Sequence, residues 1–260
     1  MKEWIRTEDL FCEEDRARTL LEYSAELDLL KELIEITEES VARKKCDETF
    51  SFEGVCYLFA KSIVKYAKAA YDNMLLGHFD ETLMICRALV ENSVCLDIFI
   101  RYEEKELWKY YLVYSYRKTL KRSKTRRKKY LKDVDKSCKR HHISKRFRQK
   151  QEDGSYINCI NKNYGWTYKV NRDFDFSGIC KLVNSADYND FQFMSEFSHG
   201  TDLHVKVFDD VTMQRITNMI SCLYYNLCRL VRMYSSDTVD DVFYDVEGEL
   251  LERLDEYVGE

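Results

Sequence analysis

Residues 81–100, ETLMICRALVENSVCLDIFI, contain the pattern that decides the fold. Apolar side chains recur there at a spacing of four or seven residues, which places them on one face of a helix. They are Leu83, Val90, Val94 and Ile98. The chain also has no proline, although an average content of about 5% would give roughly a dozen in a chain of this length. Because proline interrupts helices, the sequence predicts an all-α protein, a helical bundle with long helices.

The same periodicity predicts how the bundle is organised. A bundle core is expected over residues 50–235, with an N-terminal helix in 1–48 that packs on it and a C-terminal helix in 237–260. Within the core, a long basic helix is predicted for 104–150. An irregular loop is predicted for about 151–177, because Asn, Gly and Asp are frequent there.

Individual helix ends are predicted from capping residues and apolar recurrence. The first helix is expected to begin after Thr7, a capping residue that is followed by two acidic residues. A second helix is expected to follow Ser51 and to run towards Gly77. A third is expected from about Asp80 to Arg101.

The composition indicates a reducing compartment and no membrane span. The chain has ten cysteines but no CxxC pair, and its first 20 residues contain no apolar signal core. The most apolar window, residues 54–76, is interrupted by Lys61, Lys65 and Lys68, so it does not suit a bilayer. We therefore expect a cytoplasmic protein whose cysteines are reduced core residues, with no metal and no cofactor.

Positive charge is concentrated in residues 117–150, which we call the basic segment. This segment holds 17 Lys and Arg against two Asp, a net charge of +15, and the whole chain carries −5, so the remainder carries −20. Clustered cations gain affinity for nucleic acid by releasing counterions. The segment is therefore either a phosphate track for RNA or a solvated arm that pairs with the acidic termini. The candidate phosphate-binding residues are Lys121, Arg122, Arg126, Arg127, Lys128, Lys129 and Lys132.

A charged pair interrupts the apolar face of residues 81–100. Arg87 and Glu91 lie four residues apart on that face, one helical turn from each other. Because a buried ion needs a partner, one interpretation is a structural ion pair that fixes the helix register. The other is an anion site, in which Arg87 binds a phosphate and Glu91 orients it or a histidine. The spacing fits both.

A second polar stretch is FQFMSEFSHGT, residues 191–201, in which Phe191, Ser195 and His199 follow one another at four-residue intervals. Gly200 is the expected helix cap, which places His199 in the last turn. The helix dipole favours a protonated imidazole at that end. His199 is therefore predicted to be either a proton donor near neutral pH or a hydrogen-bonded structural residue.

These stretches occur in a recognisable order: CRALVENSVCLDIFI, then YGW, then DYNDFQFMSEFSHGT. The order resembles the helical proteins grouped as domain of unknown function 5677, and the resemblance covers about residues 50–235. In that family an Arg–x–x–x–Glu helix is followed by a tryptophan-containing loop and a Tyr-rich helix that ends in Ser–x–x–x–His–Gly. The matching positions are Arg87, Glu91, Trp166, Tyr188, Ser195, His199 and Gly200.

The bundle of this family is similar in outline to HEPN proteins, many of which are ribonucleases of toxin and antiviral systems. That resemblance implies a metal-independent ribonuclease in which His199 is a general acid or base and Arg87 stabilises the phosphorane. In the same mechanism Glu91 holds either Arg87 or His199 in position. Ser195 completes the set of candidate catalytic residues. HEPN enzymes usually carry Arg and His in one helix, whereas here two helices supply them. The alternative is a non-catalytic helical module that binds a partner protein or small ligand, and a homodimer is compatible with both.

Overall fold

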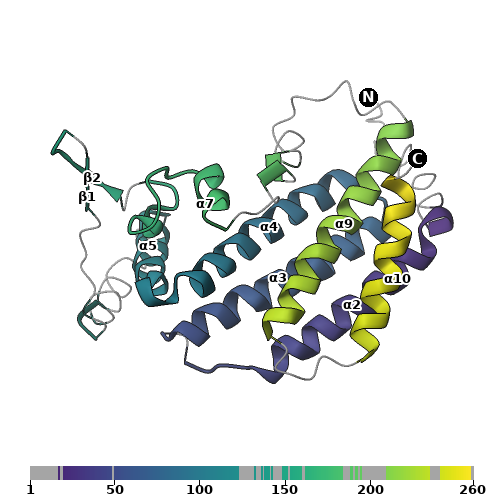
Figure 1. Ribbon diagram of the computed structural model, residues 1–260, viewed down its shortest axis with the longest axis horizontal. Coiled ribbons are helices and arrows are strands. Elements are labelled where there is room, and N and C mark those ends of the chain that lie inside the picture. Colours follow the sequence, from purple (N-terminus) through teal and green to yellow (C-terminus); the bar gives the residue numbers. More distant parts are fainter. Residues whose placement is uncertain are drawn as a thin grey trace, which may run out of the picture. The chain divides into compact units, whose positions relative to one another are not determined.

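The fold is all-α, as the sequence predicts, with one short hairpin (Figure 1). The computed structural model describes residues 17, 20–48, 50–122, 132, 136, 138–140, 142, 148–151, 153–159, 162–183, 188–189, 191–192, 194, 209–234 and 241–258. The elements are α2 (Ser24–Arg43), α3 (Phe52–Leu75), α4 (Phe79–Arg101), η1 (Glu103–Lys105), α5 (Leu107–Arg122), β1 (Arg148–Lys150), β2 (Tyr156–Asn158), η3 (Gly165–Thr167), α7 (Phe176–Val183), α9 (Asp209–Tyr234) and α10 (Asp241–Val258). None of the helices in these ranges is long and apolar enough to cross a membrane.

The ends of α3 and α4 confirm the predictions made from capping and periodicity. The Ser51 hydroxyl accepts a hydrogen bond from the Gly54 N–H at 2.9 Å and so caps the start of α3. Gly77 follows the last turn with a φ of 76°, a left-handed conformation that glycine adopts without strain. Two residues later α4 begins, and it ends at Arg101 as expected.

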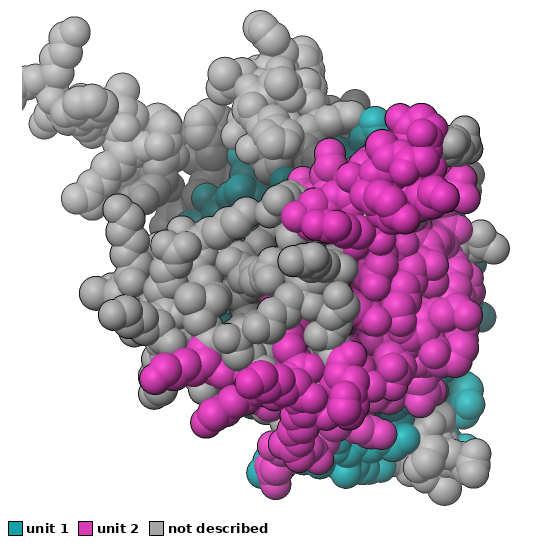
Figure 2. All heavy atoms as spheres, turned by 90° about the vertical axis from the view of Figure 1, so that its left-hand side faces the viewer, with its two compact units in different colours: residues 1–45, 60–93, 189–260 teal, residues 46–59, 94–188 magenta. Residues whose placement is uncertain are grey.

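The chain folds into two compact units, which Figure 2 colours separately. Unit 1 comprises residues 1–45, 60–93 and 189–260, and unit 2 comprises 46–59 and 94–188. In unit 1, α2, α9 and α10 pack on one another side by side (Figure 1). Apolar side chains from all three helices fill that core, among them Leu30, Leu223 and Leu250, each 0% exposed.

The core of unit 2 is built around an aromatic cluster. Trp166, in η3, is 1% exposed, and its ring centre lies 4.8 Å from that of Phe99 and 5.5 Å from that of Tyr111. Phe59 contacts both of those rings, at 5.3 and 5.1 Å. Gly178 in α7 packs closely on the segment that joins η3 to α7. A Cβ atom at Gly178 would lie 2.5 Å from the carbonyl oxygen of Asp173 in that segment.

The first predicted helix has a different extent in the structure. The first predicted helix is interrupted at Tyr23, where φ is −119° and ψ is 21°, so α2 begins only at Ser24. The Tyr23 side chain is 1% exposed and its hydroxyl lies 3.1 Å from the Thr217 hydroxyl, which fixes the break in the core. Thr7, the predicted start of this helix, lies outside the described residues. Residues 235–240, which precede α10, also lie outside them.

The helix predicted for 104–150 is wrong at both ends. Glu106 adopts a left-handed conformation with φ 52°, so η1 is separated from α5, which runs from Leu107 to Arg122. Residues 148–150 form β1, which pairs antiparallel with β2. A turn with Gly154 at φ 80° joins the strands, and the Ser155 N–H donates to the Asp153 carboxylate at 2.9 Å. The Asp–Gly dipeptide in this turn is typical of hairpins.

Candidate functional site

The predicted apolar face of α4 is the buried face of the helix. Leu83 and Val90 are each 0% exposed, which confirms the sequence pattern. Arg87 and Glu91 are half-buried, so they lie at the margin of this face instead of within the core. At a margin, the charged ends of both side chains keep access to solvent or to a ligand while their stems pack on apolar neighbours.

Arg87 contacts the second sequence motif. Its guanidinium carbon lies 4.6 Å from the centre of the Phe191 ring, a cation–π contact between residues 104 positions apart in the sequence. The positions around Phe191 that the structure describes are helical, and Met194 is 2% exposed, so this stretch packs against the core of unit 1. The structure therefore brings the Arg–x–x–x–Glu helix and the beginning of the FQFMSEFSHGT stretch together.

Arg87 has the chemistry of an anion-binding residue. Its guanidinium carries five N–H donors in one plane. Those donors match the geometry of a carboxylate or a phosphate. The contact with the Phe191 ring restricts where the guanidinium can lie.

The remaining predicted site residues are distributed as follows. Ser195, His199 and Gly200 lie outside the described residues, so the predicted proximity of His199 to Arg87 and Glu91 stays a prediction. Of the candidate phosphate-binding residues, Lys121 and Arg122 are the last two residues of α5, and Lys132 is exposed. The others, Arg126, Arg127, Lys128 and Lys129, lie outside the described residues.

The lysines and arginines of the basic segment whose exposure the structure describes face solvent. The exposed cations are Lys132, Lys136, Lys139, Arg140, Arg148 and Lys150. One of them, Arg140, forms a 3.6 Å ion pair with Glu48, and both side chains of this pair are more than half exposed. Such exposed pairs contribute at most about 1 kcal/mol, so Arg140 remains available to exchange Glu48 for a phosphate.

The motif tryptophan has a structural role. Trp166 is buried by Phe99 and Tyr111, and its neighbours Gly165 and Thr167 are buried with it. The YGW stretch therefore anchors the core of unit 2 and does not present a binding surface. Tyr188, the motif residue that precedes Phe191, is half-buried.

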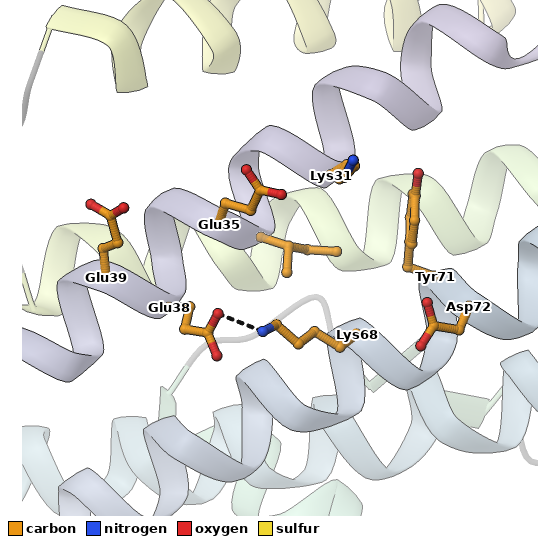
Figure 3. A pocket seen from close by; sticks show the side chains of 8 residues that line it. Lys31, Glu35, Glu38, Glu39, Lys68, Tyr71 and Asp72 are labelled. Carbon is orange, nitrogen blue, oxygen red and sulfur yellow. Dashed lines mark hydrogen bonds and ion pairs between the residues drawn. The ribbon is translucent and has the colours of Figure 1, made fainter.

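A groove lies between α2 and α3, and it was not predicted from the sequence (Figure 3). It has a volume of about 470 Å³ and is lined by Lys31, Ile34, Glu35, Glu38, Glu39, Lys68, Tyr71 and Asp72. Four carboxylates and two lysines give this lining a net charge of −2, and one of each forms the Glu38–Lys68 ion pair. The groove depends on how two separate helices pack, which no local sequence pattern indicates.

The electrostatics of this groove favour a cation. Burial raises the pKa of the Tyr71 hydroxyl, and the carboxylates of Asp28 and Asp72 raise it further. Tyr71 is therefore a neutral hydrogen-bonding group at physiological pH. Within the described ranges, no group of three or more His, Cys, Asp or Glu side chains is arranged to hold a metal ion.

The fold and the site define a class: an all-α protein in which an Arg–x–x–x–Glu helix packs against an aromatic residue of a later helix. The chain belongs to DUF5677, a family of unknown function, because the family model matches residues 53–212, more than half of the chain. The matched range includes α4 and all the motif positions from Arg87 to Gly200. No curated protein and no solved structure matches the chain.

Proposed function

We propose that the chain is a HEPN-like, metal-independent ribonuclease that acts on RNA, of the kind found in toxin and antiviral defence systems. The observation that supports this proposal most is the contact between Arg87 and Phe191. It joins the two motif stretches that the mechanism requires to meet, and it involves a guanidinium, a group whose planar N–H donors match a phosphate.

Helical spacing relates the contact to the proposed catalytic residues. If the sequence pattern from Phe191 onwards is helical, Ser195 follows one turn later and His199 two turns later on the same face. At 1.5 Å per residue, these positions are about 6 and 12 Å along the axis from Phe191. An RNA backbone that contacts Arg87 therefore runs along a face that offers a hydroxyl and then an imidazole.

The chemistry assigned to these residues is transesterification at phosphorus. The ribose 2′-hydroxyl attacks the adjacent phosphorus atom and the bond to the 5′-oxygen breaks, which yields a 2′,3′-cyclic phosphate and a 5′-hydroxyl end. His199 transfers a proton in this step as general acid or base. Arg87 stabilises the charge that builds on the phosphorane oxygens, and Glu91 orients Arg87 or His199.

The basic segment supplies the affinity for the substrate in this proposal. The cations whose exposure the structure describes are exposed, and the segment as a whole carries a net charge of +15. Such a charge binds phosphates without base specificity. Sequence preference would then arise at the site on α4 and not along the basic segment.

A cytoplasmic location fits an RNA substrate and the thiol chemistry. Burial raises the pKa of the Cys56 thiol to about 12 and also raises the pKa of Cys228. Such thiols remain protonated and unreactive. They pack as small apolar groups, as the sequence analysis expects of reduced core cysteines.

The test is cleavage of a 5′-labelled RNA by the purified chain in the presence of EDTA. Wild-type protein should release fragments with 2′,3′-cyclic phosphate ends, and Arg87→Ala and His199→Ala should each lower the rate at least about a hundredfold. A matched control is Arg101→Ala, at the other end of α4, which should cleave normally. Absence of cleavage by the wild-type chain, or cleavage that EDTA abolishes, contradicts the proposal.

A second candidate function is a non-catalytic module that binds a partner protein or small ligand, and the groove between α2 and α3 supports it. Its net charge of −2 favours a cationic ligand. Spermidine is a suitable probe, and it should raise the melting temperature of the wild-type chain but not of a Glu35→Gln, Asp72→Asn variant. A homodimer is compatible with either function, and light scattering after size-exclusion chromatography measures it.

A further inference from the structure

The β1–β2 hairpin presents one face that is polar, aromatic and exposed. Arg148 pairs with Asn158 and Lys150 pairs with Tyr156 in the antiparallel register. Directly opposed residues point to the same side of a sheet, and so do residues two apart in one strand. These four side chains therefore share one face, and all four are exposed, with Tyr156 at 63%.

The opposite side of the hairpin differs in character. Ile157, which points away from this face, is half-buried, and Cys159, the first residue after β2, is 0% exposed. The hairpin is thus anchored through Ile157 and the end of β2. Its turn is fixed as well, because the Gln151 N–H donates to the Ser155 carbonyl at 2.8 Å and the Gly154 N–H to the Gln151 carbonyl at 3.0 Å. An exposed tyrosine in such a fixed position is preorganised for contact with a ligand.

The charge on this face matches a polyanion. Arg148 and Lys150 give it a charge of +2, and none of its four positions is acidic. The two cations are the last two of the basic segment, so the face continues a stretch of strong positive charge. The nearby Asp153 carboxylate is engaged by the Ser155 N–H in the turn. Phosphates are therefore the complementary groups.

The aromatic ring selects unpaired bases over a duplex. A base gains binding energy by stacking on an exposed aromatic side chain, and stacking requires a base that is not enclosed in a helix. The deep major groove of an RNA duplex is too narrow for side chains to read. An asparagine beside the ring adds an amide that can hydrogen-bond to a base edge.

We propose that the β1–β2 hairpin is a contact site for single-stranded RNA, in which Tyr156 stacks on an unpaired base and Arg148 and Lys150 bind the flanking phosphates. This inference rests on the proposed function as an RNA-acting protein and deepens it by naming unpaired RNA as the substrate class. Asn158 contacts the edge of the stacked base or of its neighbour.

The test is fluorescence anisotropy with a labelled 2′-O-methyl oligouridine, which lacks the nucleophile and is not cleaved, and with an RNA duplex of equal length. The full chain should bind the single strand more tightly, and Tyr156→Ala should weaken that binding roughly tenfold or more, whereas Tyr156→Phe should retain it. Tyr244→Ala is the matched control, since Tyr244 in α10 is 56% exposed. Replacing both Arg148 and Lys150 by Ala should reduce the salt slope by about 1.4.

The outcomes separate this inference from the proposed function. If the wild-type chain binds neither RNA, the proposed function fails together with the hairpin site. If it binds but Tyr156→Ala has no effect, the hairpin site alone is overturned. An equal loss on the duplex and the single strand overturns the selection of unpaired bases. Circular dichroism of each variant checks that the helical fold is intact, which a substitution at the exposed face of a hairpin should leave unchanged.

Discussion

The guanidinium of Arg87 lies 4.6 Å from the ring centre of Phe191. This contact ties α4 to a residue 104 positions later in the chain, and both partners are half-buried. The contact restricts the conformations open to the arginine side chain. A positioned cation at the margin of a core is a better anion receptor than a freely rotating one, because less side-chain entropy is lost when the anion binds.

Replacing Phe191 should destabilise unit 1 and loosen Arg87. Phe191→Ala should lower the free energy of unfolding by about 1–2 kcal/mol, through the lost ring burial and the lost cation–π contact. Phe191→Leu restores apolar volume without a ring face, so the difference between the two variants isolates the cation–π part. Urea denaturation followed by circular dichroism measures both. Equal stability of all three proteins would show that the contact contributes nothing.

Trp166 should be among the most sensitive positions in unit 2. It is 1% exposed and contacts Phe99 and Tyr111, so Trp166→Ala should lower the free energy of unfolding by about 3–5 kcal/mol. Trp108→Ala is the control, because Trp108 is only half-buried and should cost less. The comparison is again made by urea denaturation. A smaller loss at Trp166 than at Trp108 contradicts the assignment of the YGW stretch as a core anchor.

The contact between α2 and α10 should weaken at alkaline pH. Burial, then the carboxylate of Glu26, raises the pKa of Tyr257 from 10.0 to about 12. A hydroxyl whose pKa is higher in the folded than in the unfolded chain stabilises the fold below pH 10.0, and that contribution is lost as the pH rises towards 12. The melting temperature should therefore fall across this window, and it should fall less in Tyr257→Phe. Parallel curves for the two proteins would contradict the assignment.

The basic segment gives a prediction about salt. Charge reversal of Lys128, Lys129 and Lys132 to Glu should weaken RNA binding and reduce the slope of log K against log salt by about 2 or more. The matched control reverses three lysines that are exposed and lie outside the segment, namely Lys44, Lys61 and Lys181. Anisotropy titrations at several salt concentrations measure the slopes. Equal slopes for the two triple variants would make the segment a solvated arm.

Local patterns in the sequence predicted the helices well. The recurrence of apolar residues between Ser51 and Gly77 is set by contacts within four residues, and the observed α3 agrees with it. The same holds for the buried face of α4. The break at Tyr23 was missed because its cause is not local: the tyrosine is held by Tyr257 and Thr217, which are distant in sequence.

The candidate site could be predicted only in part. The position of Arg87 and Glu91 on α4 follows from helical periodicity, but their half-buried state depends on which helices cover that face. The partner of Arg87 is a phenylalanine, and no charge pattern points to a ring as a partner. The β1–β2 hairpin had an Asp–Gly signal in the sequence, which the strong helical character of the basic residues before it concealed.

The last prediction concerns the trio of Arg87, Glu91 and His199. We expect the imidazole of His199 to lie close to the charged pair, because a partly buried charge needs a polar partner, and the Phe191 contact brings α4 to the stretch that carries His199. A carboxylate within about 4–6 Å raises the pKa of an imidazole by about 1 or more, and a guanidinium lowers it. Glu91→Gln should therefore lower the pKa of His199, and Arg87→Gln should raise it. Nuclear magnetic resonance titration of the histidine ring signals measures these shifts, with His199→Gln identifying the signal and the exposed His142 as the internal control.

If the trio is a catalytic site, His199→Ala should remain folded and lose RNA cleavage, whereas a structural trio should show a lower melting temperature and no separate loss. A pKa of His199 that responds to neither substitution would place the imidazole away from α4 and refute both versions.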